Sequence, residues 1–142
     1  MTTYRLHPIS SELPSEDAIA IRLGSIRDVR TFYDLVLTRR ISLDSIFHKV
    51  SIWISDPAIH ESKYESIFRI CKNSSASHSR IQLSTVRNLI RNNFKVEYDK
   101  EYPNKVWHAN IILKLNVSEF EIRILLQCFS EPIPNPARLR RV

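Results

Sequence analysis

The clearest alternation of apolar and polar residues runs from Lys105 to Phe129. In the first half of this stretch, every second residue is apolar: Trp107, Ala109, Ile111, Leu113 and Leu115. The second half repeats the pattern with Phe120, Ile122, Ile124, Leu126 and Cys128. A period of two indicates a strand with one buried face. We therefore expect a β-hairpin that turns at residues 116–119 and places Leu115 opposite Phe120.

In shorter segments of the chain, apolar residues recur either at every second position, as in a strand, or at helical spacing. Alternation predicts further strands at residues 18–23, 46–54 and 94–98. Apolar residues at helical spacing predict helices at about residues 26–39, 57–72 and 80–92. Ser25 is expected to cap the first helix, and Asp56 the second, with Pro57 in its first turn. A helix beginning at Ser15 is the alternative to the first strand, because acidic residues follow that serine.

This order of elements predicts a single α+β domain. It reads as a β-α-β unit followed by two helices and a C-terminal three-strand antiparallel meander. If the first two strands are parallel, they form a right-handed βαβ unit. The length of 142 residues suits one domain. We expect residues 1–15 to form an N-terminal arm, residues 16–130 the domain, and residues 131–142 a Pro- and Arg-rich tail with a polyproline-like start.

Charge is the main indication of function. The chain carries a formal net charge of +6 at pH 7. A positive surplus attracts polyanions, so nucleic acid, an anionic membrane surface and an acidic protein are the expected classes of partner. The alternative is a solvated surface with no partner.

The predicted helix at 80–92 supplies the first candidate binding surface. Its polar face carries Arg80, Ser84, Arg87 and Arg91 at spacings of four, three and four, with Asn88 beside them. Arginine binds phosphate with two parallel hydrogen bonds, and asparagine adds neutral ones. The serine-rich segment 73–79 just before this helix is expected to be a mobile loop. An ordinary solvated helix face is the alternative reading.

The C-terminal tail supplies the second candidate surface. Arg138, Arg140 and Arg141 form a short basic arm of the kind that adds phosphate contacts without reading sequence. Arg39 and Arg40 would extend either surface, depending on where the fold places them. The alternative is a disordered end that only adds solubility.

Aromatic and histidine residues suggest two further possibilities. Trp53 has the opposite parity to its apolar neighbours and is expected to be exposed, whereas Trp107 is expected to be buried. Exposed rings stack on the bases of single-stranded nucleic acid. His108, on the outer face of the predicted hairpin, and His78, in the predicted loop, would be the general base and acid of a small ribonuclease.

Several classes of function are disfavoured by composition. The single glycine, Gly24, argues against glycine-rich phosphate loops. The two cysteines, Cys71 and Cys128, match neither a disulfide framework nor a metal-spacing pattern, so both are expected as buried thiols. No motif indicates a metal or a cofactor. The N-terminus lacks the apolar core of a signal peptide, and no run reaches the ~18 apolar residues of a membrane span, so we expect an intracellular, cytoplasmic protein without a transmembrane segment.

The function that best fits these features is that of a small, basic, non-enzymatic module. It would bind the RNA or DNA backbone without strong sequence preference. One alternative is a viral matrix-type protein that assembles as a homo-oligomer on an anionic membrane or on nucleoprotein. A small metal-independent ribonuclease or toxin is the other alternative.

Overall fold

The computed structural model describes residues 13–38, 47–57, 59–74, 78–99 and 107–138. Its strands are β1 (Ile19–Leu23), β2 (Phe47–Ser55), β3 (Arg80–Thr85), β4 (Lys95–Tyr98), β5 (His108–Lys114) and β6 (Ile133–Pro134). Its helices are α1 (Val29–Thr38), α2 (Lys63–Asn73), α3 (Val86–Arg91) and α4 (Glu119–Gln127), with a 3-10 helix, η1, at Pro136–Arg138. Within these described ranges, no helix is long and apolar enough to cross a bilayer.

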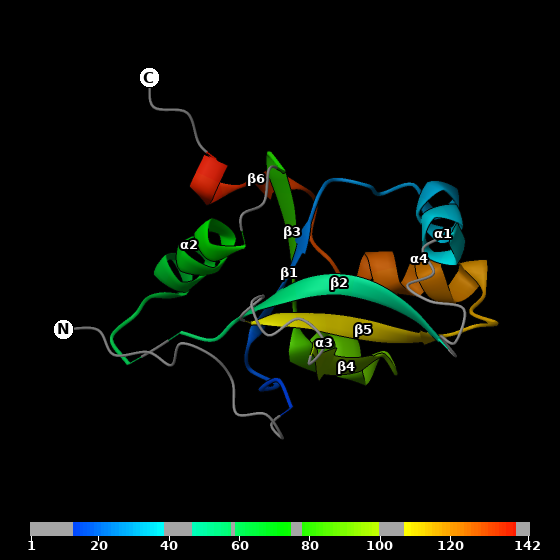
Figure 1. The fold of residues 1–142 in the computed structure, drawn as a ribbon, viewed down its shortest axis with the longest axis horizontal. Coiled ribbons are helices and arrows are strands. Elements are labelled where there is room, and N and C mark those ends of the chain that lie inside the picture. Colours follow the sequence, from blue (N-terminus) through cyan, green and yellow to red (C-terminus); the bar gives the residue numbers. More distant parts are fainter. Residues whose placement is uncertain (1–12, 39–46, 58, 75–77, 100–106, 139–142) are drawn as a thin grey trace.

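The strands form one antiparallel sheet in the order β4-β5-β2-β1-β3-β6 (Figure 1). The prediction of a single α+β domain is confirmed. The first two strands are antiparallel, with Ile19 beside Ser55 and Ile21 beside Trp53, so a parallel βαβ unit is excluded. The predicted strands at 18–23, 46–54 and 94–98 and the predicted helix at 26–39 are all present, with shifts of a few residues at their ends.

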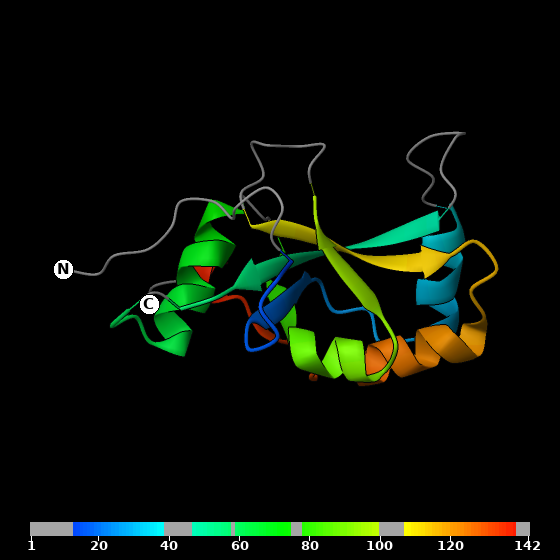
Figure 2. The same cartoon turned by 90° about the horizontal axis from the view of Figure 1, so that it is seen from below.

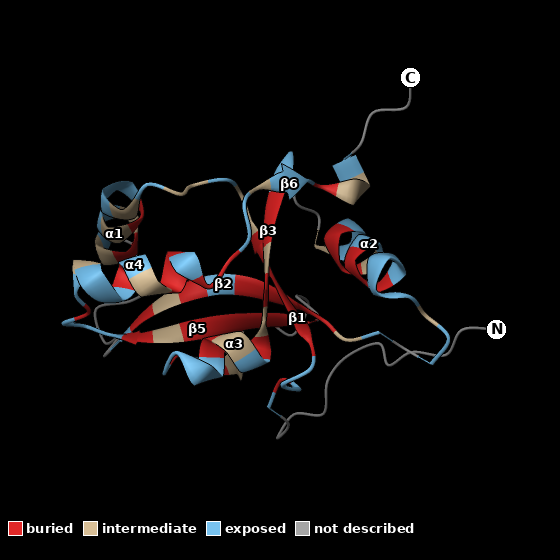
Figure 3. Ribbon diagram, turned by 180° about the vertical axis from the view of Figure 1, so that it is seen from behind, coloured by how far each residue is buried: buried red, intermediate tan, exposed pale blue. Residues whose placement is uncertain are grey.

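Helices α3 and α4 lie beneath the sheet in Figure 2, and α1 stands at the end of β2. Alternate residues of the central strands, such as Ile52 and Ile111, are fully buried, and so is Ile122 of α4. Figure 3 shows this burial concentrated in the middle strands. The helices therefore take one face of β2 and β5 out of water, and Lys49, Ser51 and Asn110 lie on the other face.

The second half of the predicted hairpin is wrong, because residues 119–127 form α4. Ser118 and Glu121 build a capping box: the Ser118 hydroxyl accepts from the Glu121 amide at 3.1 Å, and the Glu121 carboxylate accepts from the Ser118 amide at 3.3 Å. This pair satisfies first-turn amides and favours a helix start. The same apolar residues contain a helical spacing, since Ile122 and Leu126 are four apart and both are buried. Phe120, which the hairpin would bury, is 68% exposed.

The predicted helix at 80–92 is also wrong in its first half. Residues 80–85 form β3, which pairs with β1 on one side and with β6 on the other. The helix begins only after Thr85, whose hydroxyl accepts from the Asn88 amide at 3.0 Å. The physical reason is that β3 completes the hydrogen bonding of β1, and this long-range gain outweighs local helical periodicity. The predicted arginine face is therefore divided between a strand and a short helix.

Two caps differ from their predictions. Helix α2 begins at Lys63 and is capped by Ser62, not by Asp56, whose following proline lies well before the helix. At α1 the Asp28 carboxylate, rather than Ser25, accepts from the Thr31 amide at 2.9 Å. The Thr31 hydroxyl also donates to this carboxylate at 2.7 Å, and this bond, followed by the one from the amide, lowers the pKa of Asp28 below its usual value.

The ends of the chain and the serine-rich segment are only partly described. Most of the expected N-terminal arm lies outside the described residues, as do residues 75–77 of the expected loop. Within the expected tail, residues 133–134 form β6 and residues 136–138 form η1. The division into an arm, a domain and a tail stays a prediction.

Candidate functional site

The structure brings two of the predicted binding arginines to the same end of the sheet. Arg80 begins β3 and pairs with Pro134 of β6. Arg138 ends η1, which follows β6 directly and is held there by the Asn135 amide, a donor to the Ser79 carbonyl at 2.9 Å. Residues from the predicted helix and the predicted tail, far apart in sequence, therefore meet through the pairing of β3 with β6.

The other described members of the predicted helix face lie elsewhere. Arg87 is bound to the Asp17 carboxylate at 2.7 Å, so its charge is balanced. Ser84 is buried, and the side chain of Asn88 donates to the Cys128 carbonyl at 3.2 Å, which is a packing role. Arg91 is exposed in the last turn of α3. Arg39, Arg40, Arg140 and Arg141 lie outside the described residues.

Helix α2 contacts η1 and carries exposed side chains of its own. Tyr64, Phe68 and Lys72 follow one another at spacings of four, so they share one side of the helix. Tyr64 is 61% exposed and Phe68 is 39% exposed, whereas Ile67 and Ile70 of the same helix are buried. Figure 1 places α2 next to η1, and the two elements are in contact.

We call Tyr64, Phe68, Lys72, Arg80 and Arg138 the α2 surface. Within the described part of the chain, none of its three cations forms a salt bridge. Arg69, on another side of α2, is instead bound to Glu61 at 2.8 Å. Cations and exposed aromatic rings together are the combination that proteins use to bind single-stranded nucleic acid. Periodicity could have revealed the row of Tyr64, Phe68 and Lys72, but not the contact between α2 and η1.

Neither tryptophan contributes an exposed ring. Trp107 is buried, as predicted. Trp53 is only 8% exposed, so the prediction that it is exposed is wrong. β2 is an inner strand with β1 and β5 on either side, and the Trp53 ring lies 4.9 Å from the His108 ring.

A second cluster lies on the sheet face opposite α3 and α4. The His108 Nδ1 atom is 2.8 Å from an Asp99 carboxylate oxygen, and the His108 Nε2 atom is hydrogen-bonded to the Ser51 hydroxyl. The histidine and aspartate side chains are nearly buried, whereas Ser51 is exposed. His108 therefore lies on the predicted face, but between two partners rather than free in solvent.

These three residues come from three neighbouring strands. Ser51 is on β2, His108 is on β5, and Asp99 directly follows β4. The Asp99 amide donates to the His108 carbonyl at 3.0 Å, which holds the carboxylate alongside the ring. Sequence reasoning missed Ser51 and Asp99. The outward parity of Ser51 on its strand was readable, but the pairing that sets it beside His108 was not.

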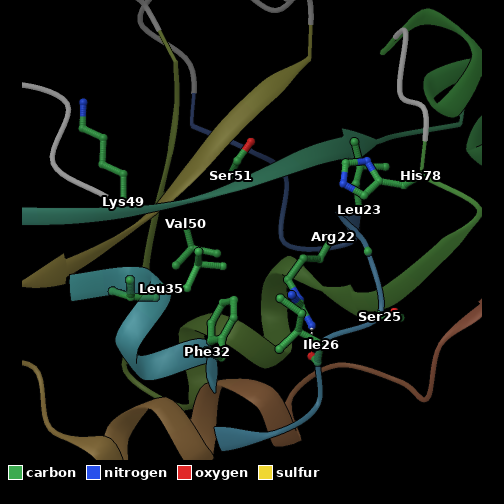
Figure 4. A pocket seen from close by; sticks show the side chains of 12 residues that line it. Arg22, Leu23, Ser25, Ile26, Phe32, Leu35, Lys49, Val50, Ser51 and His78 are labelled. Carbon is green, nitrogen blue, oxygen red and sulfur yellow. Dashed lines mark hydrogen bonds between the residues drawn. The ribbon is translucent and has the colours of Figure 1, made fainter. Parts of the chain in front are cut away.

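A cleft of about 380 Å³ opens beside Ser51, between β2 and the end of β1. It exists because β1 pairs with β2 only as far as Ile21 and then continues with β3 alone. Its walls are mostly apolar and include Leu23, Ile26, Leu35 and Val50. In Figure 4, Lys49 and Ser51 extend from one side of β2 and Val50 from the other.

Arg22 forms part of the cleft lining and carries a buried charge. It is 5% exposed, donates to the Ile26 carbonyl and to the Gln82 side chain, and stacks 4.7 Å from the centre of the Phe32 ring. Burial, together with the charge of Arg27, lowers the pKa of Arg22 to about 10. The guanidinium thus remains a cation at neutral pH, and its Nε atom has no hydrogen-bond partner.

The two histidines of the ribonuclease alternative have different surroundings. His78 lines the cleft near Gly24, whereas His108 is bonded to Ser51 and Asp99. Within the described residues, no group of three His, Cys, Asp or Glu side chains could hold a metal ion. Neither a family model, nor a curated protein, nor a solved structure matches this chain.

Proposed function

We propose that the protein binds single-stranded nucleic acid, without strong sequence preference, through the α2 surface. Lys72, Arg80 and Arg138 would contact phosphates, and Tyr64 and Phe68 would stack on bases. The observation that supports this most directly is the contact of η1, which carries Arg138, with α2, which carries an exposed aromatic pair and Lys72.

The chemistry of each group suits this role. Arginine offers a planar fork of donors to a phosphate, and lysine offers a point charge. Every base has a π-face, so stacking on a tyrosine or phenylalanine ring tolerates any sequence. The net charge of +6 would also speed encounter with a polyanion. Arg140 and Arg141 follow Arg138 in the sequence and add two further positive charges to the chain.

The proposal is tested by fluorescence anisotropy with a labelled 20-nucleotide single-stranded RNA between 50 and 200 mM salt. Each phosphate contact contributes about 0.7 to the slope of log affinity against log salt for a single strand. The double variant Arg80→Ala, Arg138→Ala should therefore lower the magnitude of the slope by about 1.4. Arg87→Ala is the matched control, because the Asp17 carboxylate already balances this arginine.

Three outcomes would count against the proposal. Absence of RNA binding at low salt would reject it, and so would an equal loss of affinity in the control and the double variant. Flotation with phosphatidylserine vesicles, without RNA binding, would instead favour the membrane-assembly alternative, which a sizing column would test further through the oligomeric state.

A further inference from the structure

We infer that Ser51, His108 and Asp99 form a hydrolytic site that cleaves carboxylic esters. This activity is independent of nucleic-acid binding, because the residues lie on β2, on β5 and just after β4, not on the α2 surface. The inference begins from one chain of hydrogen bonds, from the Asp99 carboxylate to the His108 ring and on to the Ser51 hydroxyl.

The order of contacts assigns a role to each side chain. A carboxylate only accepts hydrogen bonds, so the His108 Nδ1 atom that faces it must carry the proton. The Nε2 atom then has a free lone pair and accepts from the Ser51 hydroxyl. A serine that donates to an imidazole held in this tautomer is an activated nucleophile, with the histidine as general base. Asp99 acts through His108 and is a positioning residue.

Accessibility matches these roles. The side chains of His108 and Asp99 are nearly buried, which fixes the ring beside the carboxylate. Ser51 is exposed, so a substrate can reach its hydroxyl.

The backbone offers a donor for the developing negative charge. The Ile54 amide donates to the Trp107 carbonyl, on the β5 side of β2. Amide directions alternate along a strand, so the Ser51 amide points to the opposite side. That side is where β1 separates from β2, beyond the pair of Ile21 and Trp53. The amide of the nucleophile therefore faces the cleft, where it can bind the oxyanion of a tetrahedral intermediate.

The reaction consumes one ester and one water. The Ser51 Oγ atom attacks the carbonyl carbon, and its proton moves to His108 Nε2. As the tetrahedral intermediate collapses, the bond to the leaving alcohol breaks and His108 protonates that alcohol. A water then attacks the acyl-serine and gives its proton to His108. The bond to Ser51 Oγ breaks, the oxygen regains the proton, and the carboxylic acid leaves.

The full chain should hydrolyse p-nitrophenyl butyrate and react with a fluorophosphonate probe, with mass spectrometry locating the probe on Ser51. Ser51→Ala should remove the labelling and reduce kcat about 10³-fold or more. His108→Gln should reduce kcat by about 10²–10⁴-fold, the usual contribution of a general base. Asp99→Asn should lower kcat with KM unchanged, because it alters only the histidine tautomer.

Ser15→Ala is the matched control, because Ser15 is an exposed serine that does not line the cleft. It should keep the wild-type rate and labelling. If His108→Gln fails to fold, as judged by circular dichroism, the labelling of the wild-type protein and of Ser51→Ala still decides the question. The inference is overturned if the wild-type protein shows neither turnover nor labelling, or if Ser51→Ala retains both. RNA binding need not change in any of these variants.

Discussion

Strand β5 and helix α4 are neighbours in the sequence and carry the same alternating pattern, yet they fold differently. β5 lies between β2 and β4, with Ala109 and Ile111 fully buried. α4 packs against α1 and buries Ile122 and Leu125. The two patterns can be told apart only at positions where strand parity and helical spacing disagree.

Phe120 and Leu125 are those positions. Strand parity would bury Phe120 and expose Leu125, whereas the structure leaves Phe120 68% exposed and Leu125 1% exposed. The Ser118–Glu121 capping box explains the choice, since it supplies a helix start directly after the turn. The comparison teaches that the four-residue capping box at 118–121 can outweigh the alternation of residues 120–128.

The largest expected difference in stability is that between the alanine variants of Leu125 and Phe120. Leu125→Ala should lower the free energy of unfolding by about 2–5 kcal/mol, because it leaves a cavity in the core. Phe120→Ala should change it by less than about 0.5 kcal/mol, because its ring is largely in water. Urea denaturation of both variants checks this. A larger loss of stability for Phe120→Ala than for Leu125→Ala would support the hairpin instead of α4.

An intermediate effect is expected from the capping serine. Ser118→Ala removes the acceptor for the Glu121 amide and should cost about 1 kcal/mol. Ser118→Asp retains an acceptor and serves as the control, with stability close to that of the wild type. Urea denaturation measures the difference. Equal stability of Ser118→Ala and the wild type would mean that the capping box does not select the helix.

The smallest effect on the free energy of unfolding at neutral pH is expected from the two thiols. Cys128 would be buried whether its segment formed a strand or a helix, so it does not distinguish the two. Burial raises the pKa of Cys71 to about 11 from 9.0, and it raises that of Cys128 in the same direction. Between pH 9 and 11 the unfolded chain therefore releases thiol protons that the folded chain retains. The free energy of unfolding should fall as the pH rises through this window.

The thiol prediction is checked by urea denaturation at pH 8 and pH 10. The double variant Cys71→Val, Cys128→Val should lose less stability between the two values than the wild type does, because other titrating groups are common to both. Identical losses would show that the thiols ionise equally in the folded and unfolded chains.

Most of the strands could be predicted because each has one clean buried face. Alternation predicts β1, β2, β4 and β5, and helical spacing of apolar residues predicts α1. β3 was merged with α3 because Ile81 and Leu89 fit one helical stripe, although they belong to different elements. The prediction for Trp53 is wrong because parity alone does not reveal that the His108 ring lies 4.9 Å from its ring.

The candidate sites were less predictable than the fold. Arg80 and Arg138 were both named from the sequence, but for surfaces that were expected to be separate. Arg87 was named as well, and only the fold reveals the Asp17 carboxylate beside it. The sequence predicts that His108 acts with His78 as the acid and base of a ribonuclease. In the structure, His108 is instead hydrogen-bonded to Ser51 and Asp99.

The amino-acid sequence by itself determined the periods of its segments, the capping box before α4 and the positive charge. These depend on residues within a few positions of one another, or on composition alone. Only the tertiary structure decided which strands pair, which arginines stay without an acid, and that Ser51 meets a histidine 57 residues away. The physical reason is that sheet register and side-chain contacts across strands minimise the free energy of the whole chain, and local periodicity carries no record of them.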